Sequence, residues 1–198
     1  MKILVIGAAG TIGRAVVEQL ATRHEVIAVG RSSGERVDMS DIASVHDLFE
    51  RVSKVDAVVV AAGEVHFGPL SEMTPDHFAV GLQGKLMGQV NVALVAQHYL
   101  NDGGSITLTS GVLTDDPIRY GVSATTVNAA VEGFVRAAAL ELPRGIRINV
   151  VSPSVLEESL GSYGPYFLGF EAVPAKRVAL AFVKSIEGLQ TGKVLRVW

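Results

Sequence analysis

The chain has 198 residues, of which 48% are hydrophobic, a formal net charge of -3 and no cysteine. This length and composition predict one α/β domain over residues 1–198 with a substantial core. The lack of cysteine excludes disulfides, thiol catalysis and thiolate metal sites, and we expect no metal site. We find no basic cluster interleaved with aromatic residues, no apolar run of membrane-spanning length and no leader before the first predicted strand. We therefore expect a cytoplasmic protein that binds neither nucleic acid nor a membrane.

The first turn of the chain predicts a nucleotide site. An uncharged aliphatic run follows Lys2 and is typical of a buried parallel strand, and three glycines then lead into a helical pattern. Glycines in this context let a dinucleotide pyrophosphate reach free backbone N–H groups at the helix N-terminus, where the helix dipole favours negative charge. The predicted contacts are Gly7, Ala9, Gly10, Thr11, Ile12 and Gly13. The alternative is a purely structural glycine turn.

The residues after the second predicted strand, 25–30, indicate which cofactor binds. That strand ends in Gly30, where a protein that uses NAD would carry an acid for the ribose hydroxyls. Arg31, Ser32 and Ser33 follow instead, and a guanidinium with two hydroxyls suits the 2′-phosphate of NADP(H). The alternative is a solvated arginine in a loop.

Two further stretches complete the predicted cofactor site. A very short strand over 37–39 places Asp38, beside Met39, to accept a hydrogen bond from an adenine amino group, although Asp38 could equally cap the turn before the next helix. The next buried strand, 54–63, ends in small residues that let the adenosine ribose lie against the backbone. These small residues are Ala61, Ala62 and Gly63.

The rest of the chain alternates helices and strands. We predict helices over 41–52, 74–99, 125–142 and 174–186, strands over 105–109, 145–151 and 193–197, and a flap rich in glycine and aromatic residues over 156–172. Apolar side chains surround most of the helix at 125–142, which favours burial against a partner subunit as well as against the sheet. The alternation predicts a doubly wound parallel sheet, the Rossmann fold, of about seven strands with its ligand across the carboxyl edge.

Several landmarks, taken in order, resemble those of the short-chain dehydrogenase/reductase family over nearly the whole chain. They are the glycine turn and the stretches 61–63, 106–110, 128–133 and 145–153. The resemblance implies NAD(P) at the strand tips, with the nicotinamide carboxamide held by backbone near Pro153 and Val155. It also implies a small-molecule substrate, and homodimers or tetramers built on the two long helices.

The catalytic positions depart from the family pattern. The family's Tyr and the Lys four residues later match Ala124 and Asn128 here, while the family's Asn on the preceding long helix matches Lys85. We hypothesise that Lys85, with Asn128 as its hydrogen-bond partner, holds the ribose hydroxyls and stabilises developing negative charge. The alternative is a lysine on the exposed side of an amphipathic helix. The resemblance also implies that Ser110 polarises the substrate carbonyl.

The missing phenol leaves the proton donor open. General acid catalysis is worth roughly 10²- to 10⁴-fold, so its loss predicts a slow enzyme, an easily reduced substrate or no enzyme. Tyr120, Lys85 or a water held by Ser110 could replace the phenol, and Tyr120 could instead be a packed loop residue. We predict an NADPH-dependent oxidoreductase that transfers hydride to a carbonyl-like small molecule. The alternative is a non-catalytic protein that binds or senses NADP(H).

Overall fold

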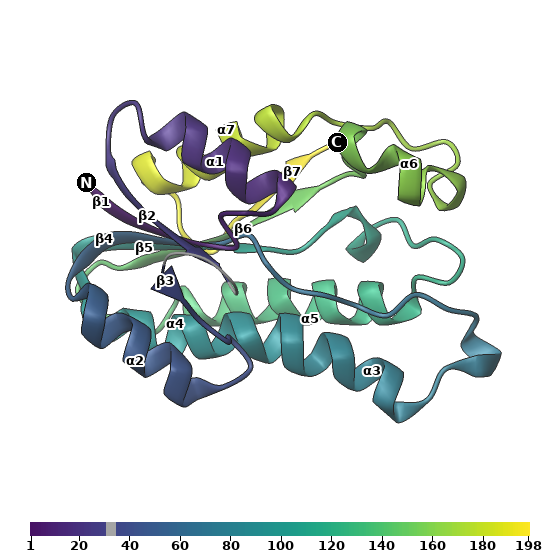
Figure 1. The fold of residues 1–198 in the computed structure, drawn as a ribbon, viewed down its shortest axis with the longest axis horizontal. Helices are drawn as coiled ribbons and strands as arrows, with labels where there is room; N and C mark the ends of the chain where they lie inside the picture. Colours follow the sequence, from purple (N-terminus) through teal and green to yellow (C-terminus); the bar gives the residue numbers. More distant parts are fainter. Residues whose placement is uncertain (31–34) are drawn as a thin grey trace.

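The strands form one parallel sheet. The structure, a computed structural model, describes residues 1–30 and 35–198. Within these residues seven strands pair in parallel in the order β3-β2-β1-β4-β5-β6-β7 (Figure 1). The chain begins inside the sheet and winds outward in both directions, which places the switch point between β1 and β4. The predicted doubly wound fold is confirmed.

The elements have the following bounds. The strands are β1 (Lys2–Ile6), β2 (Glu25–Gly30), β3 (Glu35–Arg36), β4 (Val55–Val60), β5 (Leu100–Thr109), β6 (Arg147–Pro153) and β7 (Val194–Val197). The α-helices are α1 (Thr11–Leu20), α2 (Ile42–Val52), α3 (Pro75–Gly81), α4 (Gly88–Tyr99), α5 (Val122–Ala138), α6 (Leu160–Tyr163) and α7 (Ala175–Glu187). Single 3₁₀ turns lie at Leu70–Glu72, Val112–Thr114, Glu157–Ser159 and Gly164–Tyr166, and a π-helical turn, Leu82–Met87, joins α3 to α4.

Helices cover both faces of the sheet. α1 and α7 pack together on one face, and α2, α4 and α5 cover the other (Figure 1). The central strands are buried on both faces, which explains why β1 and β4 are nearly continuous aliphatic runs. None of the described helices is long and apolar enough to cross a membrane. Because both faces are covered, the carboxyl edge of the sheet is the place where a ligand can reach several strands at once.

The glycine turn lets α1 begin directly at the tip of β1. Gly7 has φ +86°, which residues with side chains rarely adopt. The N–H groups of Gly7 and Ala8 donate to the carbonyl of Val29 at 2.9 and 3.1 Å, so the turn is anchored to β2. A Cβ on Gly7 would lie 2.5 Å from the carbonyl oxygen of Ala61, and a Cβ on Gly13 would collide with the carbonyl of Gly7.

Three predicted elements differ from those observed. The strand expected over 37–39 is wrong, because the edge strand that pairs with the end of β2 is β3, which ends at Arg36, before that segment. The helix expected over 74–99 is present, but its pitch changes at the π-helical turn. β5 starts at Leu100, earlier than predicted, and a register shift against β4 takes up the additional residues.

We expect Gly13→Ala to lower the free energy of unfolding by roughly 1–3 kcal/mol, because the added methyl group must displace the backbone of the glycine turn. Urea denaturation measures this change. The matched control is Gly133→Ala in α5, where a Cβ meets no atom within 4 Å, and we expect it to stabilise the protein by up to about 1 kcal/mol through helix propensity. Similar effects at the two positions would contradict the packing argument.

Candidate functional site

A groove of about 870 Å³ runs along the carboxyl edge of the sheet, across the switch point between β1 and β4. Its size falls in the range of cofactor and small-molecule sites. The lining residues are Ile6, Gly7, Ala9, Gly10, Gly30, Arg36, Val37, Asp38, Met39, Ser40, Ser44, Ala61, Ala62, Gly63, Glu64, Val80 and Gly84. The groove therefore connects the glycine turn, the ends of β2 and β3, and the tip of β4.

Many of the residues that the sequence predicts for the cofactor site line this groove. They are Gly7, Ala9, Gly10, Asp38, Met39, Ala61, Ala62 and Gly63. Thr11, Ile12 and Gly13 form the first turn of α1 beside the groove, and Pro153 and Val155 lie at the end of β6. Arg31, Ser32 and Ser33 lie outside the described residues, so their role at a 2′-phosphate stays a prediction.

The N-terminus of α1 suits an anion. Gly10 is the N-cap residue, in an extended conformation, and no described side chain caps the helix. The first turn also carries no acidic residue. The helix therefore offers backbone N–H groups and the positive end of its dipole without a competing carboxylate.

The sequence analysis missed Arg36, which lines the groove together with Gly30. Arg36 is exposed at the end of β3. Arg51 on α2 secures this short strand, because its guanidinium donates to the Arg36 carbonyl at 3.2 Å and to the Glu35 carboxylate at 3.1 Å. A signal was available: the short segment between Gly30 and α2 must bring a second arginine to the same edge.

Asp38 has the partners of a turn-capping residue. Its Oδ1 accepts from the N–H of Ser40 at 2.9 Å and from the hydroxyl of Ser40 at 2.6 Å. The hydroxyl of Ser44 accepts from the Asp38 N–H at 3.0 Å, and Asn91 of α4 donates to the Met39 carbonyl at 3.0 Å. Two helices thus hold this loop at the groove, and the contact of Asp38 with adenine stays a prediction.

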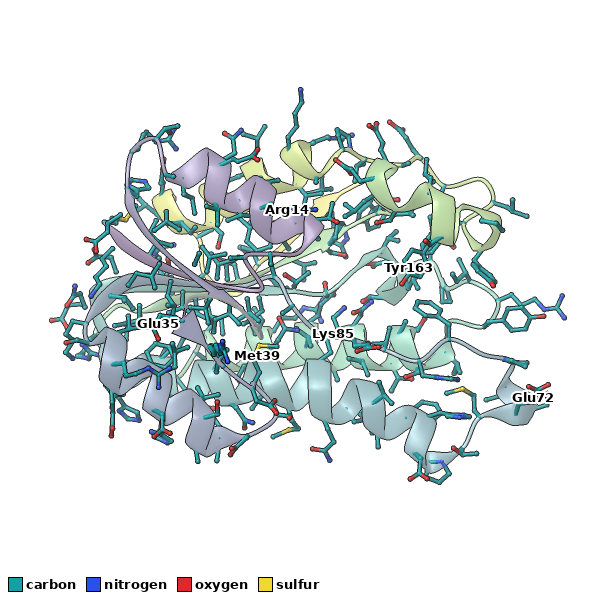
Figure 2. All side chains as sticks on the ribbon, viewed as in Figure 1. Arg14, Glu35, Met39, Glu72, Lys85 and Tyr163 are labelled. Carbon is teal, nitrogen blue, oxygen red and sulfur yellow. The ribbon has the colours of Figure 1, made fainter. Side chains whose placement is uncertain are left out.

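Lys85 lies beside the groove on the π-helical turn, near the centre of the molecule in Figure 2. Its Nζ donates to Asn128 Oδ1 at 2.6 Å and to the carbonyl of Ser110 at 3.3 Å. Its methylene stem crosses Gly63 so closely that a Cβ there would lie 2.5 Å from Lys85 Cγ. Lys85 is therefore not on an exposed helix face. π-Helical turns are frequent at functional sites, and this one presents the lysine to α5.

Gln89 ties α4 to the tip of β5. Its fully buried side-chain amide donates to the carbonyl of Thr109 at 3.0 Å and accepts from the N–H of Thr109 at 2.8 Å. The side chain thus pairs with the strand end as another strand would, and it fixes the position of Ser110, the next residue. The sequence analysis missed Gln89, although a glutamine in a largely apolar helix is a signal for such a contact.

Burial lowers the pKa of Lys85 to about 8, because the protein interior solvates an ammonium group less well than water does. An amine with this pKa is mostly protonated at neutral pH, yet releases its proton more readily than an exposed lysine. This balance suits a group that must donate a proton during a reaction and regain it afterwards.

A family model described as enoyl-(acyl carrier protein) reductase matches residues 5–185. The chain belongs to the short-chain dehydrogenase/reductase family. Members of this family are oxidoreductases, and relatives of the chain are named reductases and dehydrogenases.

Relatives in this family include proteins of known structure. The protein lin1944 from Listeria innocua is 52% identical, with a TM-score of 0.98 over 100% of both chains. A small-chain dehydrogenase in complex with NADPH is 27% identical, with a TM-score of 0.89 over 100% of this chain and 96% of that one. L-xylulose reductase of Homo sapiens is 27% identical over 179 residues, which are 81% of this chain and 73% of the reductase. The chain matches only 52% of the length of an uncharacterized oxidoreductase of Methylorubrum extorquens.

Ser110, the expected carbonyl-polarising residue of this short-chain dehydrogenase/reductase, directs its hydroxyl at a buried acid. The hydroxyl donates to Glu132 Oε1 at 2.9 Å, and Glu132 Oε2 accepts from the guanidinium of Arg136 at 3.0 Å. Glu132 is fully buried. The hydroxyl of Ser110 therefore donates its hydrogen bond to another residue of the protein, while the backbone carbonyl of Ser110 accepts from Lys85.

Tyr120 lies in a packed loop. Its φ is +69°, its ring meets the ring of Tyr166 edge-on with 6.3 Å between centroids, and the guanidinium of Arg119 lies 4.9 Å from its ring centre. These contacts correspond to the loop alternative, and the role of Tyr120 as a proton donor stays a prediction.

The flap over 156–172 packs near the position at which the family has its tyrosine. Ala124, at that position, is 2% exposed and belongs to a small apolar cluster with Val112 and Leu113. Phe167 and Phe170 of the flap pack against this cluster. Within the described residues no group of three or more potential metal ligands gathers here or elsewhere.

We expect the Lys85 amine to titrate with a midpoint near pH 8, because burial disfavours its charged form. Carbon-13 NMR of lysine Cε, followed across pH 6–11, measures the midpoint. The Lys85→Met variant assigns the resonance, because that signal alone should vanish. A midpoint above pH 10 would contradict the buried environment.

Proposed function

We propose that the chain is an NADPH-dependent oxidoreductase that reduces a carbonyl group of a small molecule, with Lys85 as the proton donor. The observation that carries this proposal is the placement of the Lys85 ammonium group. Asn128 and the Ser110 carbonyl hold it at 2.6 and 3.3 Å, at the strand tips and directly beside the groove. A charged group held at that point can act on the bond that a bound cofactor would reduce.

The residues around the groove fit a nicotinamide dinucleotide. The glycine turn packs against Ala61 too closely for a Cβ on Gly7, and the N-terminus of α1 offers free donors for a pyrophosphate. The small residues Ala61 and Gly63 leave room for a ribose at the tip of β4. The cofactor supplies a hydride when bound, and the chain supplies the proton, the orientation and the binding energy.

The proposed step reduces a carbonyl group to an alcohol. The carbonyl carbon gains the hydride, the carbonyl π bond breaks, and the oxygen takes a proton from Lys85 Nζ. The substrate leaves as an alcohol and Lys85 is left as a neutral amine, which regains a proton from water. The lowered pKa of Lys85 favours this transfer, because the amine is then a stronger acid than an exposed lysine.

Arg36 supports NADPH as the preferred cofactor. Its position on β3, in the groove lining that it shares with Gly30, suits a guanidinium that pairs with a phosphate on the adenosine ribose. Arg31, Ser32 and Ser33 remain additional candidates for that contact. A related small-chain dehydrogenase with NADPH bound is consistent with this choice.

A second function, non-catalytic binding of NADP(H), is favoured by one observation. The flap aromatics Phe167 and Phe170 pack against the apolar cluster that contains Ala124, the position at which the family has its tyrosine. If the flap does not open, the protein can bind the cofactor but cannot admit a substrate. Turnover decides between the two functions.

We propose further that the protein is a homodimer, or a tetramer of such dimers, that uses α4 and α5. An apolar groove of about 330 Å³ between these helices is lined by Leu94 and Phe134, among others. Leu94 is 44% exposed although it lies in this groove. A second copy would cover this surface. A cytoplasmic location stays a prediction.

We expect the wild-type protein to consume NADPH in the presence of aldehydes, ketones, diketones or quinones, and to use NADH less well. Lys85→Met should lower kcat by roughly 10²-fold or more, because general acid catalysis is lost. Tyr120→Phe should leave kcat nearly unchanged. The wild-type kcat/KM should fall as the pH rises through about 8, since the ammonium form is the donor.

Other outcomes would redirect the proposal. Loss of turnover in Tyr120→Phe with full activity in Lys85→Met would identify Tyr120 as the acid. Tight NADPH binding in fluorescence titrations, with no turnover on any substrate, would favour the non-catalytic function.

We expect light scattering to give the wild-type protein a mass of at least two chains, and Leu94→Glu to give the mass of one, because a charge would be buried at the shared surface. The control is Leu180→Glu. Leu180 is 57% exposed on α7, across the sheet from α4. A wild-type mass of one chain would overturn the proposed dimer.

A further inference from the structure

The side-chain amide of Asn128 has a fixed orientation. Asn128 is 4% exposed on α5, and its Oδ1 accepts from Lys85 Nζ at 2.6 Å. An ammonium group can only donate, so the oxygen of the amide must be the atom that faces Lys85. The nitrogen, with its two hydrogens, must therefore face the other way.

The amide nitrogen points at Gly111. A Cβ built on Gly111 would lie 3.1 Å from Asn128 Nδ2 and 3.9 Å from Asn128 Cγ, so the nitrogen is the nearer atom. The carbonyl oxygen of Pro153 lies 3.8 Å from the same Cβ position. Nδ2 thus lies where a side chain at position 111 would lie, at the strand tips between β5 and β6.

Asn128 Nδ2 has no hydrogen-bond acceptor within the part of the chain that the structure describes. Nδ2 is not among the fully enclosed side-chain atoms that lack a partner, so it stays within reach of water, and a ligand atom could replace that water as its acceptor. Ser110 cannot take this role while its hydroxyl donates to Glu132. The amide of Asn128 is therefore a donor beside Lys85 that a ligand could use.

The geometry points to Asn128 as a catalytic residue that donates a hydrogen bond from Nδ2 to the substrate carbonyl oxygen. This inference rests on the proposed function and gives Asn128 a task beyond holding Lys85. In the reaction the carbonyl carbon gains the hydride and its oxygen becomes negative. Asn128 stabilises that oxygen through its N–H group and keeps both amide hydrogens, whereas Lys85 Nζ gives up the proton that forms the alcohol.

The first test is Asn128→Asp, measured with NADPH and the best carbonyl substrate. Aspartate keeps the shape of asparagine and still accepts from Lys85, but it has no N–H to donate. We expect kcat to fall by roughly 10²- to 10³-fold, the usual effect of removing one such donor, with the Kd of NADPH nearly unchanged. The control for the amide-to-acid change is Gln190→Glu, at an exposed position near the start of β6.

Two double variants, both built on Asn128→Ala, separate the loss of the donor from the added charge of an aspartate. In Asn128→Ala the space above Gly111 opens, and Gly111→Ser in that background places a hydroxyl where Nδ2 was. Gly111→Ala in the same background adds the Cβ without the donor, and the backbone there is extended, which any residue adopts. We expect the double variant with serine to be at least tenfold faster than the double variant with alanine.

A third measurement does not depend on turnover. The infrared C=O stretch of a carbon-13 labelled ketone, bound together with NADP⁺, should lie at higher frequency in Asn128→Asp than in the wild type, because a hydrogen bond to the carbonyl is missing.

A failure of the role of Asn128 can be distinguished from a failure of the proposed function. Asn128→Asp with kcat within threefold of the wild type, or serine and alanine double variants with equal rates, would overturn the role of Asn128 alone. A wild-type protein that reduces no carbonyl compound would overturn the proposed function and this inference together.

Discussion

The hydrogen bond from Lys85 Nζ to Asn128 Oδ1 is the contact on which the rest of the site depends. It joins the π-helical turn to α5 across the ends of the strands. Burying an ammonium group is expensive unless acceptors replace its water, and here the amide oxygen and the Ser110 carbonyl do so. The two acceptors do not replace all of the lost hydration, and the pKa of Lys85 is lowered as a result. The same bond orients the amide of Asn128.

The parallel sheet explains why these groups meet. The tips of β4, β5 and β6 end at one edge, and each is followed by a residue that leaves space or offers a carbonyl. Gly63 gives room for the stem of Lys85, and Gly111 gives room for the amide of Asn128. Gln89 pairs with Thr109 and so keeps α4 in register with β5. The lack of a side chain at Gly63 and Gly111 is therefore as important to this site as the side chains of Lys85 and Asn128.

The sequence predicts the sheet, most helices, the glycine turn and the pairing of Lys85 with Asn128, because each depends on local patterns or on a register between long elements. The sequence does not predict β3 at its observed position or the π-helical turn. Both depend on how many residues are available to connect neighbouring elements whose positions are fixed by other contacts. The expected contact of Ser110 with the substrate stays a prediction, and the local sequence does not show that its hydroxyl donates a hydrogen bond to Glu132, on another element. The sequence does not indicate that Arg36 lines the groove, because the position of Arg36 depends on the number of residues between β2 and β3.

The exchange of lysine and asparagine between two helices changes the chemistry without moving the site. In the family pattern the acid is a phenol, whereas here Ala124 leaves that place to the flap aromatics. The proposed proton donor is then an amine whose pKa of about 8 lies below that of a phenol. A stronger acid donates more readily, but it also loses its proton at lower pH. With Lys85 as the proposed proton donor, this pKa would favour reduction near neutral pH over the reverse oxidation, which needs the neutral amine as proton acceptor.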